Sequence, residues 1–121
     1  MATILIADDA PVMRRMLASI LTRAGHRIVG EAEDGRQAVE LYRELKPDLV
    51  TMDITMPELD GISAIREILR EEPRARIVVF SALDQQLLIV SAIEAGAKDF
   101  VVKPFLEGKV VDVVTNVLRG K

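Results

Sequence analysis

The sequence predicts an α/β domain, with a doubly wound, five-stranded parallel sheet and five helices. Short apolar runs alternate five times with segments whose apolar residues recur at helical spacing, as in successive βα units. The runs are apolar at nearly every position, which is typical of parallel strands that are buried on both faces. A chain of 121 residues fits one compact domain. We therefore expect a single domain over residues 1–121.

The first βα unit occupies the start of the chain. Residues 4–7 form an apolar run that predicts a buried strand, and residues 12–24 follow as a helix. Asp9 is the expected cap of this helix, Pro11 lies in its first turn, and Gly25 follows its end. The apolar residues of the helix recur three and four positions apart: Met13, Met16, Leu17, Ile20 and Leu21.

The next four units repeat the pattern, and three of their strands end at a polar residue. The second unit has strand 27–32 and helix 35–45, and the third has strand 49–52, ending at Asp53, and helix 62–72. The fourth has strand 77–80, ending at Ser81, and helix 84–95, closed by Gly96. The fifth has strand 100–102, ending at Lys103, and helix 107–118.

The residues that follow these strands define a candidate site. Because ligands of open α/β sheets bind at the carboxyl ends of the strands, we expect Asp8, Asp9, Asp53, Ser81 and Lys103 to share one rim. Three carboxylates held together repel one another, and a hard divalent cation such as Mg²⁺ relieves that repulsion. The hydroxyl and the ammonium group could then contact a phosphoryl group. A carboxylate can attack phosphorus and form an aspartyl phosphate.

Each of these residues also has an ordinary explanation when taken alone. A single Asp after a strand is most often a helix cap or turn residue. Ser81 alone fits a turn hydroxyl, and Lys103 alone fits a solvated surface lysine. The functional interpretation therefore depends on four strand ends that carry complementary chemistry together.

The sequence resembles the receiver domains of two-component response regulators over essentially its whole length. Within that family it is most similar to the stand-alone chemotaxis regulators. Each matching segment is short, but their order and spacing are specific to the family. The segments are residues 6–9 (IADD), 52–57 (MDITMP) with Asp60 and Gly61, 80–82 (FSA), 95–97 (AGA) and 100–105 (FVVKPF).

The resemblance implies a role for each site residue. Asp53 accepts the phosphoryl group, and Mg²⁺ is bound by Asp9, Asp53 and the backbone carbonyl of Thr55, with Asp8 acting through water. Ser81 and Lys103 contact the phosphate. Phe100 is implied as the switch aromatic and the Lys103–Pro104 bond as cis, and the implied strand order is 2-1-3-4-5.

The implied function is a phosphorylation-activated switch. It receives its phosphoryl group from a histidine kinase and controls a protein target, with the flagellar motor switch as one candidate in chemotaxis. Such a domain catalyses its own phosphorylation and dephosphorylation without being a conventional enzyme. Three alternatives remain: a receiver cut from a larger regulator, a Mg²⁺-dependent phosphohydrolase, and a degenerate receiver. Thr55 lies where a phosphohydrolase of the haloacid dehalogenase type needs a second carboxylate.

Composition excludes some other classes. Cysteine is absent and no basic block stands out from the net charge of -3, so we expect no disulfides and no direct binding of nucleic acid. No long apolar run is present, so we expect a cytoplasmic protein without a signal peptide or membrane span. A monomer or a phosphorylation-dependent dimer is expected.

The fourth predicted helix has apolar residues on more than one side. We expect Leu88, Ala92 and Ala95 to share one face, with Ile89 and Ile93 exposed beside the fifth strand and fifth helix. This exposed surface is the expected binding site for the target.

Overall fold

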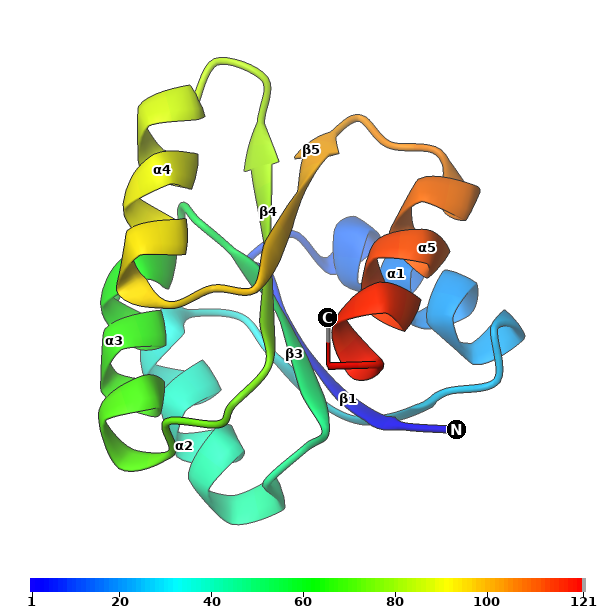
Figure 1. The fold of residues 1–121 in the computed structure, drawn as a ribbon, viewed down its shortest axis with the longest axis horizontal. Coiled ribbons are helices and arrows are strands. Elements are labelled where there is room, and N and C mark those ends of the chain that lie inside the picture. Colours follow the sequence, from blue (N-terminus) through cyan, green and yellow to red (C-terminus); the bar gives the residue numbers. More distant parts are fainter. Residues whose placement is uncertain (121) are drawn as a thin grey trace.

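Five parallel strands form one sheet, and helices cover both of its faces (Figure 1). The structure is a computed structural model, and it describes residues 1–120. The strands are β1 (Thr3–Ala7), β2 (Arg27–Ala32), β3 (Leu49–Asp53), β4 (Ile77–Ala82) and β5 (Asp99–Lys103). The helices are α1 (Pro11–Arg23), α2 (Gly35–Leu45), α3 (Gly61–Glu71), α4 (Gln86–Ala95) and α5 (Glu107–Leu118).

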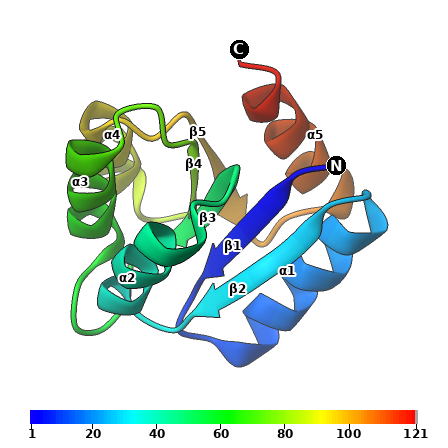
Figure 2. The same cartoon turned by 90° about the horizontal axis from the view of Figure 1, so that it is seen from below.

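The strand order is β2-β1-β3-β4-β5, as expected. Every neighbouring pair is parallel. Figures 1 and 2 show α2, α3 and α4 on one face of the sheet and α1 and α5 on the other. The order reverses direction at β1, so the ends of β1 and β3 lie at the switch point where α/β sheets bind ligands.

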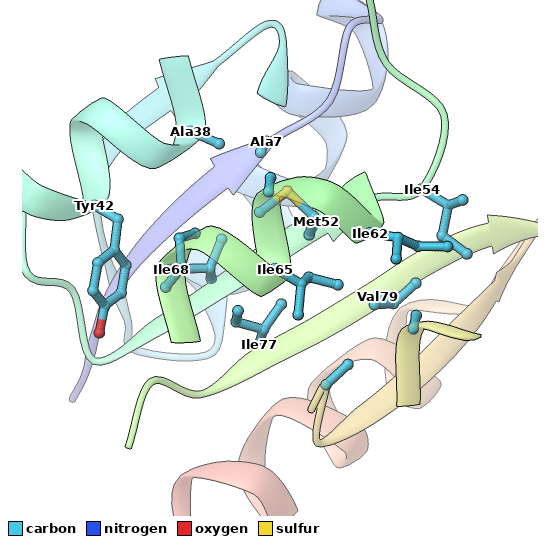
Figure 3. Close-up of a cluster of buried hydrophobic side chains, with 14 of the residues drawn as sticks. Ala7, Ala38, Tyr42, Met52, Ile54, Ile62, Ile65, Ile68, Ile77 and Val79 are labelled. Carbon is cyan, nitrogen blue, oxygen red and sulfur yellow. The ribbon is translucent and has the colours of Figure 1, made fainter. Parts of the chain in front are cut away.

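The core consists of two aliphatic clusters, one on each face of the sheet. Alternate strand residues enter opposite clusters: Leu5 and Ala7 face α2 and α3, whereas Ile4 and Ile6 face α1 and α5. Figure 3 shows the larger cluster between α3 and the sheet. Because both faces are covered, the central strands are apolar almost throughout, and β3 is buried at every position.

The predicted helix boundaries hold within about two residues, with one wrong cap. Pro11 begins α1 as expected, but the N-cap is Ala10, and no side chain caps the helix. Instead, the Asp8 carboxylate accepts a hydrogen bond from the Ala10 N–H at 2.9 Å. Helix α4 begins at Gln86 rather than at Asp84, because residues 83 and 84 form a turn. None of the helices in residues 1–120 is long and apolar enough to cross a bilayer.

The expected exposure of Ile89 is wrong. Ile89 is 8% exposed and belongs to the larger core cluster, together with Ala92. Ile93 is 40% exposed and Leu88 is also 40% exposed. Apolar residues occur all round α4, so periodicity did not identify the face that packs on the sheet.

Candidate functional site

Three carboxylates meet at the carboxyl ends of β1 and β3. Asp8 and Asp9 follow β1, and Asp53 is the last residue of β3. One carboxylate oxygen from each residue lies within 4.8 Å of the others. Asp8 and Asp53 are buried and Asp9 is exposed. The three carboxylates thus lie together, as expected from their positions after the strands.

Lys103 supplies the positive charge of this cluster. It is the last residue of β5. Its Nζ lies 3.0 Å from Asp8 Oδ2 and 3.4 Å from Asp53 Oδ1. One ammonium group thus faces two buried carboxylates, which leaves the acidic cluster with an excess of negative charge.

Burial raises the pKa of the Asp53 carboxyl from its ordinary 3.8 to about 6. The Lys103 charge opposes this rise, the Asp8 carboxylate adds to it, and a backbone hydrogen bond from Thr55 lowers the pKa again. Desolvation is the largest of these effects, so the ionised carboxylate is incompletely compensated. A cation placed among the three carboxylates would stabilise the ionised form. Hard oxygen donors of this kind suit Mg²⁺.

Ser81 lies beside Asp53 in the sheet and is fully buried. Asp53 pairs with Phe80 across β3 and β4, and Ser81 is the next residue along β4. Within residues 1–120 the Ser81 hydroxyl has no hydrogen-bond partner. A buried hydroxyl without a partner costs free energy. A phosphoryl oxygen on Asp53 is a suitable acceptor for it.

The loop after β3 presents Thr55 at the edge of the site. Thr55 is exposed, two residues beyond Asp53. The Ile54 N–H donates to the Phe80 carbonyl at 3.1 Å, and the Gly61 N–H donates to the Ile54 carbonyl at 2.8 Å. A β-carbon at Gly61 would overlap the Asp53 carbonyl oxygen, so glycine lets the start of α3 pack against this loop.

Phe100 lies apart from the carboxylates, on β5. It is 38% exposed and borders a groove of about 520 Å³ between α4 and β5. The Lys103–Pro104 peptide bond is cis. The groove is lined mainly by apolar side chains: Leu83, Ile89, Val90, Ile93, Phe100 and Val102, with Gln86 and Glu94.

Sequence reasoning missed two residues beside the site. The Arg14 guanidinium donates to the Asp8 carbonyl at 2.6 Å and pairs with Glu31 at 3.0 Å, which ties α1 and β2 to the end of β1. The Gln85 side chain joins the loops after β3 and β4. No spacing or motif signals either residue, because each contact depends on how a long side chain crosses between loops.

Comparison with known proteins finds close relatives along the whole chain. A family model described as the response regulator receiver domain matches residues 4–115. The chain is 57% identical to the chemotaxis protein CheY of Thermotoga maritima over 116 residues, which cover 96% of this chain and 97% of that protein. It is 54% identical to the CheY of Bacillus subtilis, with the same coverage.

A solved structure shares both fold and sequence with this chain. It is the CheX-CheY-BeF3-Mg+2 complex of Borrelia burgdorferi, with a TM-score of 0.91 and 38% identity. The match covers 95% of this chain and 87% of that chain. At this identity the similarity extends beyond the general α/β topology.

Proposed function

Because this chain belongs to the response regulator receiver domain family, we propose that residues 1–121 form one receiver domain that phosphorylation of Asp53 switches on. A receiver domain is a signalling protein rather than a conventional enzyme. The observation that carries the proposal is the buried Asp53 carboxylate, which lies within 4.8 Å of the Asp8 and Asp9 carboxylates and 3.4 Å from the ammonium group of Lys103. A histidine kinase is the proposed phosphodonor.

Asp8, Asp9 and Asp53, with the backbone carbonyl of Thr55, would hold Mg²⁺. The fit is supported by the oxygen donors that lie within 4.8 Å of one another and by the incompletely compensated charge of Asp53. The bound ion would neutralise the carboxylates and orient the oxygens of the incoming phosphoryl group.

Asp53 acts as the nucleophile in the proposed transfer. A carboxylate oxygen of Asp53 forms a bond to phosphorus while the bond between phosphorus and the donor nitrogen breaks, and that nitrogen keeps the bonding electron pair. Lys103, already 3.4 Å from Asp53, offsets the negative charge of the phosphoryl oxygens. The Ser81 hydroxyl donates a hydrogen bond to one of these oxygens and gains a partner, which it lacks among residues 1–120 at rest. Hydrolysis of the aspartyl phosphate returns the switch to its resting state.

The output surface is proposed on α4, β5 and α5. When Ser81 moves toward the phosphoryl group, Phe100 turns inward and the groove between α4 and β5 changes shape. A protein target that presents apolar side chains would bind there. The CheY relatives support a role in cytoplasmic chemotaxis signalling, with the flagellar motor switch as the proposed target.

Incubation with acetyl phosphate and Mg²⁺ tests the proposal. We expect the wild type to form one labile acyl phosphate per chain and Asp53→Asn to form none, with its far-UV circular dichroism unchanged. Asp48→Asn is the matched control, since this aspartate lies before β3 and bonds Thr3 rather than the site. Continuous turnover of small phosphate esters would indicate a phosphohydrolase instead. Absence of any adduct in the wild type would indicate a degenerate receiver.

A further inference from the structure

Gln85 joins the two loops that border the proposed phosphorylation site. The backbone N–H of Ala82 donates to Gln85 Oε1 at 2.7 Å. Gln85 Nε2 in turn donates to Thr55 Oγ1, also at 2.7 Å. Both ends of the amide are therefore used, and these two contacts fix its orientation.

The bridge lies beyond the last paired residues of β3 and β4. Asp53 and Phe80 form the final pair of this ladder, and a single backbone bond from Ile54 to Phe80 follows it. Beyond that point, the bond from Gln85 Nε2 to Thr55 Oγ1 connects the two loops. Figure 1 shows the loop between β4 and α4 rising clear of the sheet, so its position depends on such contacts.

The bridge also fixes the residue next to Ser81. Ala82 follows Ser81 directly, and its N–H donates the hydrogen bond that Gln85 accepts. Any movement of the Ser81 backbone toward Asp53 therefore also moves this N–H. In the resting structure the Ser81 hydroxyl has no partner within residues 1–120, although it is fully buried. Ser81 and Ala82 also pair with Val102 and Lys103 of β5. Gln85 therefore acts together with this pairing to hold Ser81 where its hydroxyl has no partner within residues 1–120.

We propose that Gln85 is a positioning residue that holds Ser81 and Ala82 in the resting arrangement and so opposes capture of a phosphoryl group. This inference rests on the proposed function, because it requires Ser81 to engage a group bound to Asp53. A phosphoryl group competes with the bridge: the Ser81 hydroxyl gains an acceptor as the contact between Ala82 and Gln85 loosens. A hydrogen bond of this kind changes an equilibrium by roughly two- to tenfold.

Beryllofluoride with Mg²⁺ is the probe, and its affinity for the protein is measured by titration calorimetry. Gln85→Met keeps the length of the side chain but removes both hydrogen bonds. We expect it to bind beryllofluoride roughly two- to tenfold more tightly than the wild type. Gln37→Met is the matched control, since it removes a glutamine amide on α2 that bonds the Glu33 N–H, and its affinity is expected to stay at the wild-type value.

A double-mutant cycle tests the bridge itself. Thr55→Val removes the hydroxyl but keeps the shape of the side chain, so it also tightens the binding of beryllofluoride. In the Gln85→Met background, Thr55→Val is expected to raise the affinity for beryllofluoride by less than it does in the wild-type background. The affinity for Mg²⁺ alone is expected to stay unchanged in Gln85→Met. A general loosening of the site would alter that affinity.

Two results would overturn the inference. They are an unchanged or weaker beryllofluoride affinity in Gln85→Met, and full additivity with Thr55→Val. If Gln85→Met fails to fold, Thr55→Val still decides, because a beryllofluoride affinity equal to that of the wild type overturns the bridge. A wild type that binds no beryllofluoride, or an Asp53→Asn variant that binds it normally, would instead remove the proposed function.

Discussion

At Asp53, burial and charge oppose each other. Asp53 is 7% exposed, and the pKa of its carboxyl is raised to about 6 despite the nearby ammonium group of Lys103. An acid whose pKa is higher in the folded chain than in the unfolded chain favours folding while it is protonated. This contribution is complete below the unfolded pKa of 3.8 and is lost as the pH rises through about 6.

We therefore expect Asp53→Asn to stabilise the metal-free protein at neutral pH. A shift of about two pKa units corresponds to at most roughly 3 kcal/mol, so we expect the free energy of unfolding to rise by about 1–3 kcal/mol at pH 7.5. The gain should shrink toward zero near pH 4. Urea unfolding in the presence of a chelator, at a series of pH values, measures this difference. A gain that does not depend on pH would contradict the assigned cause.

Asp9 provides a second test at the level of single residues. Because Mg²⁺ binds the folded site, it should raise the melting temperature of the wild type by roughly 5 °C at about ten times its dissociation constant. Asp9→Ala should reduce this shift and leave the metal-free protein as stable or more stable. Asp112→Ala, on the exposed face of α5, is the control, and Mg²⁺ should raise its melting temperature as much as that of the wild type. Equal shifts in the two variants would exclude Asp9 as a ligand.

The convergence of the site residues followed from their positions after the strands. Asp8 follows one parallel strand, and Asp53 and Lys103 end two others of the same sheet. Topology alone therefore brings their backbones to the same rim. The side-chain contacts of Gln85 and Arg14 do not follow from topology, since they depend on rotamers and loop conformations. That the Ser81 hydroxyl finds no partner in the described part of the chain is likewise a property of packing that the residue type does not reveal.

At the level of elements, α4 shows where periodicity fails. Most helices here have one apolar face, and their buried residues matched the expected spacing, as in α3. In α4, exposed apolar residues surround the buried pair of Ile89 and Ala92, with Leu87 84% and Val90 54% exposed. Val90 and Ile93 line the groove between α4 and β5, whereas Leu87 does not. These apolar residues outside the core obscured the helical spacing of the core residues.

The two isoleucines of α4 should therefore respond differently to a charge. Ile89→Asp places a carboxylate in the core and should lower the free energy of unfolding by about 2–5 kcal/mol. Ile93→Asp, one turn away and exposed, should change it by no more than about 0.5 kcal/mol. Urea unfolding of both variants provides the comparison, with each serving as the control for the other. Similar losses in the two would show that Ile93 is also part of the core.

At the scale of the whole molecule, the sheet connects two surfaces. The ends of β1 and β3 form the acidic site, while β5 carries both Lys103, which pairs with Asp8 and Asp53, and Phe100, which borders the groove. The alternation of strands and helices predicted the parallel sheet, and the family resemblance supplied its strand order. Neither the alternation nor the resemblance predicts which residues are exposed on the surface of the folded protein, because their exposure depends on how the helices pack together.

Phe100 offers a direct readout of coupling between these surfaces, because the chain contains no tryptophan. In a Phe100→Trp variant, the added indole would be the single tryptophan, placed at a position that is 38% exposed at rest. If the ring turns inward when Asp53 carries a phosphoryl group, beryllofluoride with Mg²⁺ should shift its emission to shorter wavelength. The same variant carrying Asp53→Asn should show no shift.

A tryptophan that replaces Glu44, exposed on α2 and away from β5, provides the control and should report no change. Binding of beryllofluoride that raises the melting temperature but leaves the Phe100→Trp emission unchanged would exclude Phe100 as the moving group. The effect of modifying Asp53 would then have to reach the groove through α4 alone. An emission shift that survives in the Asp53→Asn background would show that the ring responds to the ions rather than to the modified carboxylate. The coupling between the two surfaces is established when the shift requires both Asp53 and the phosphoryl analogue.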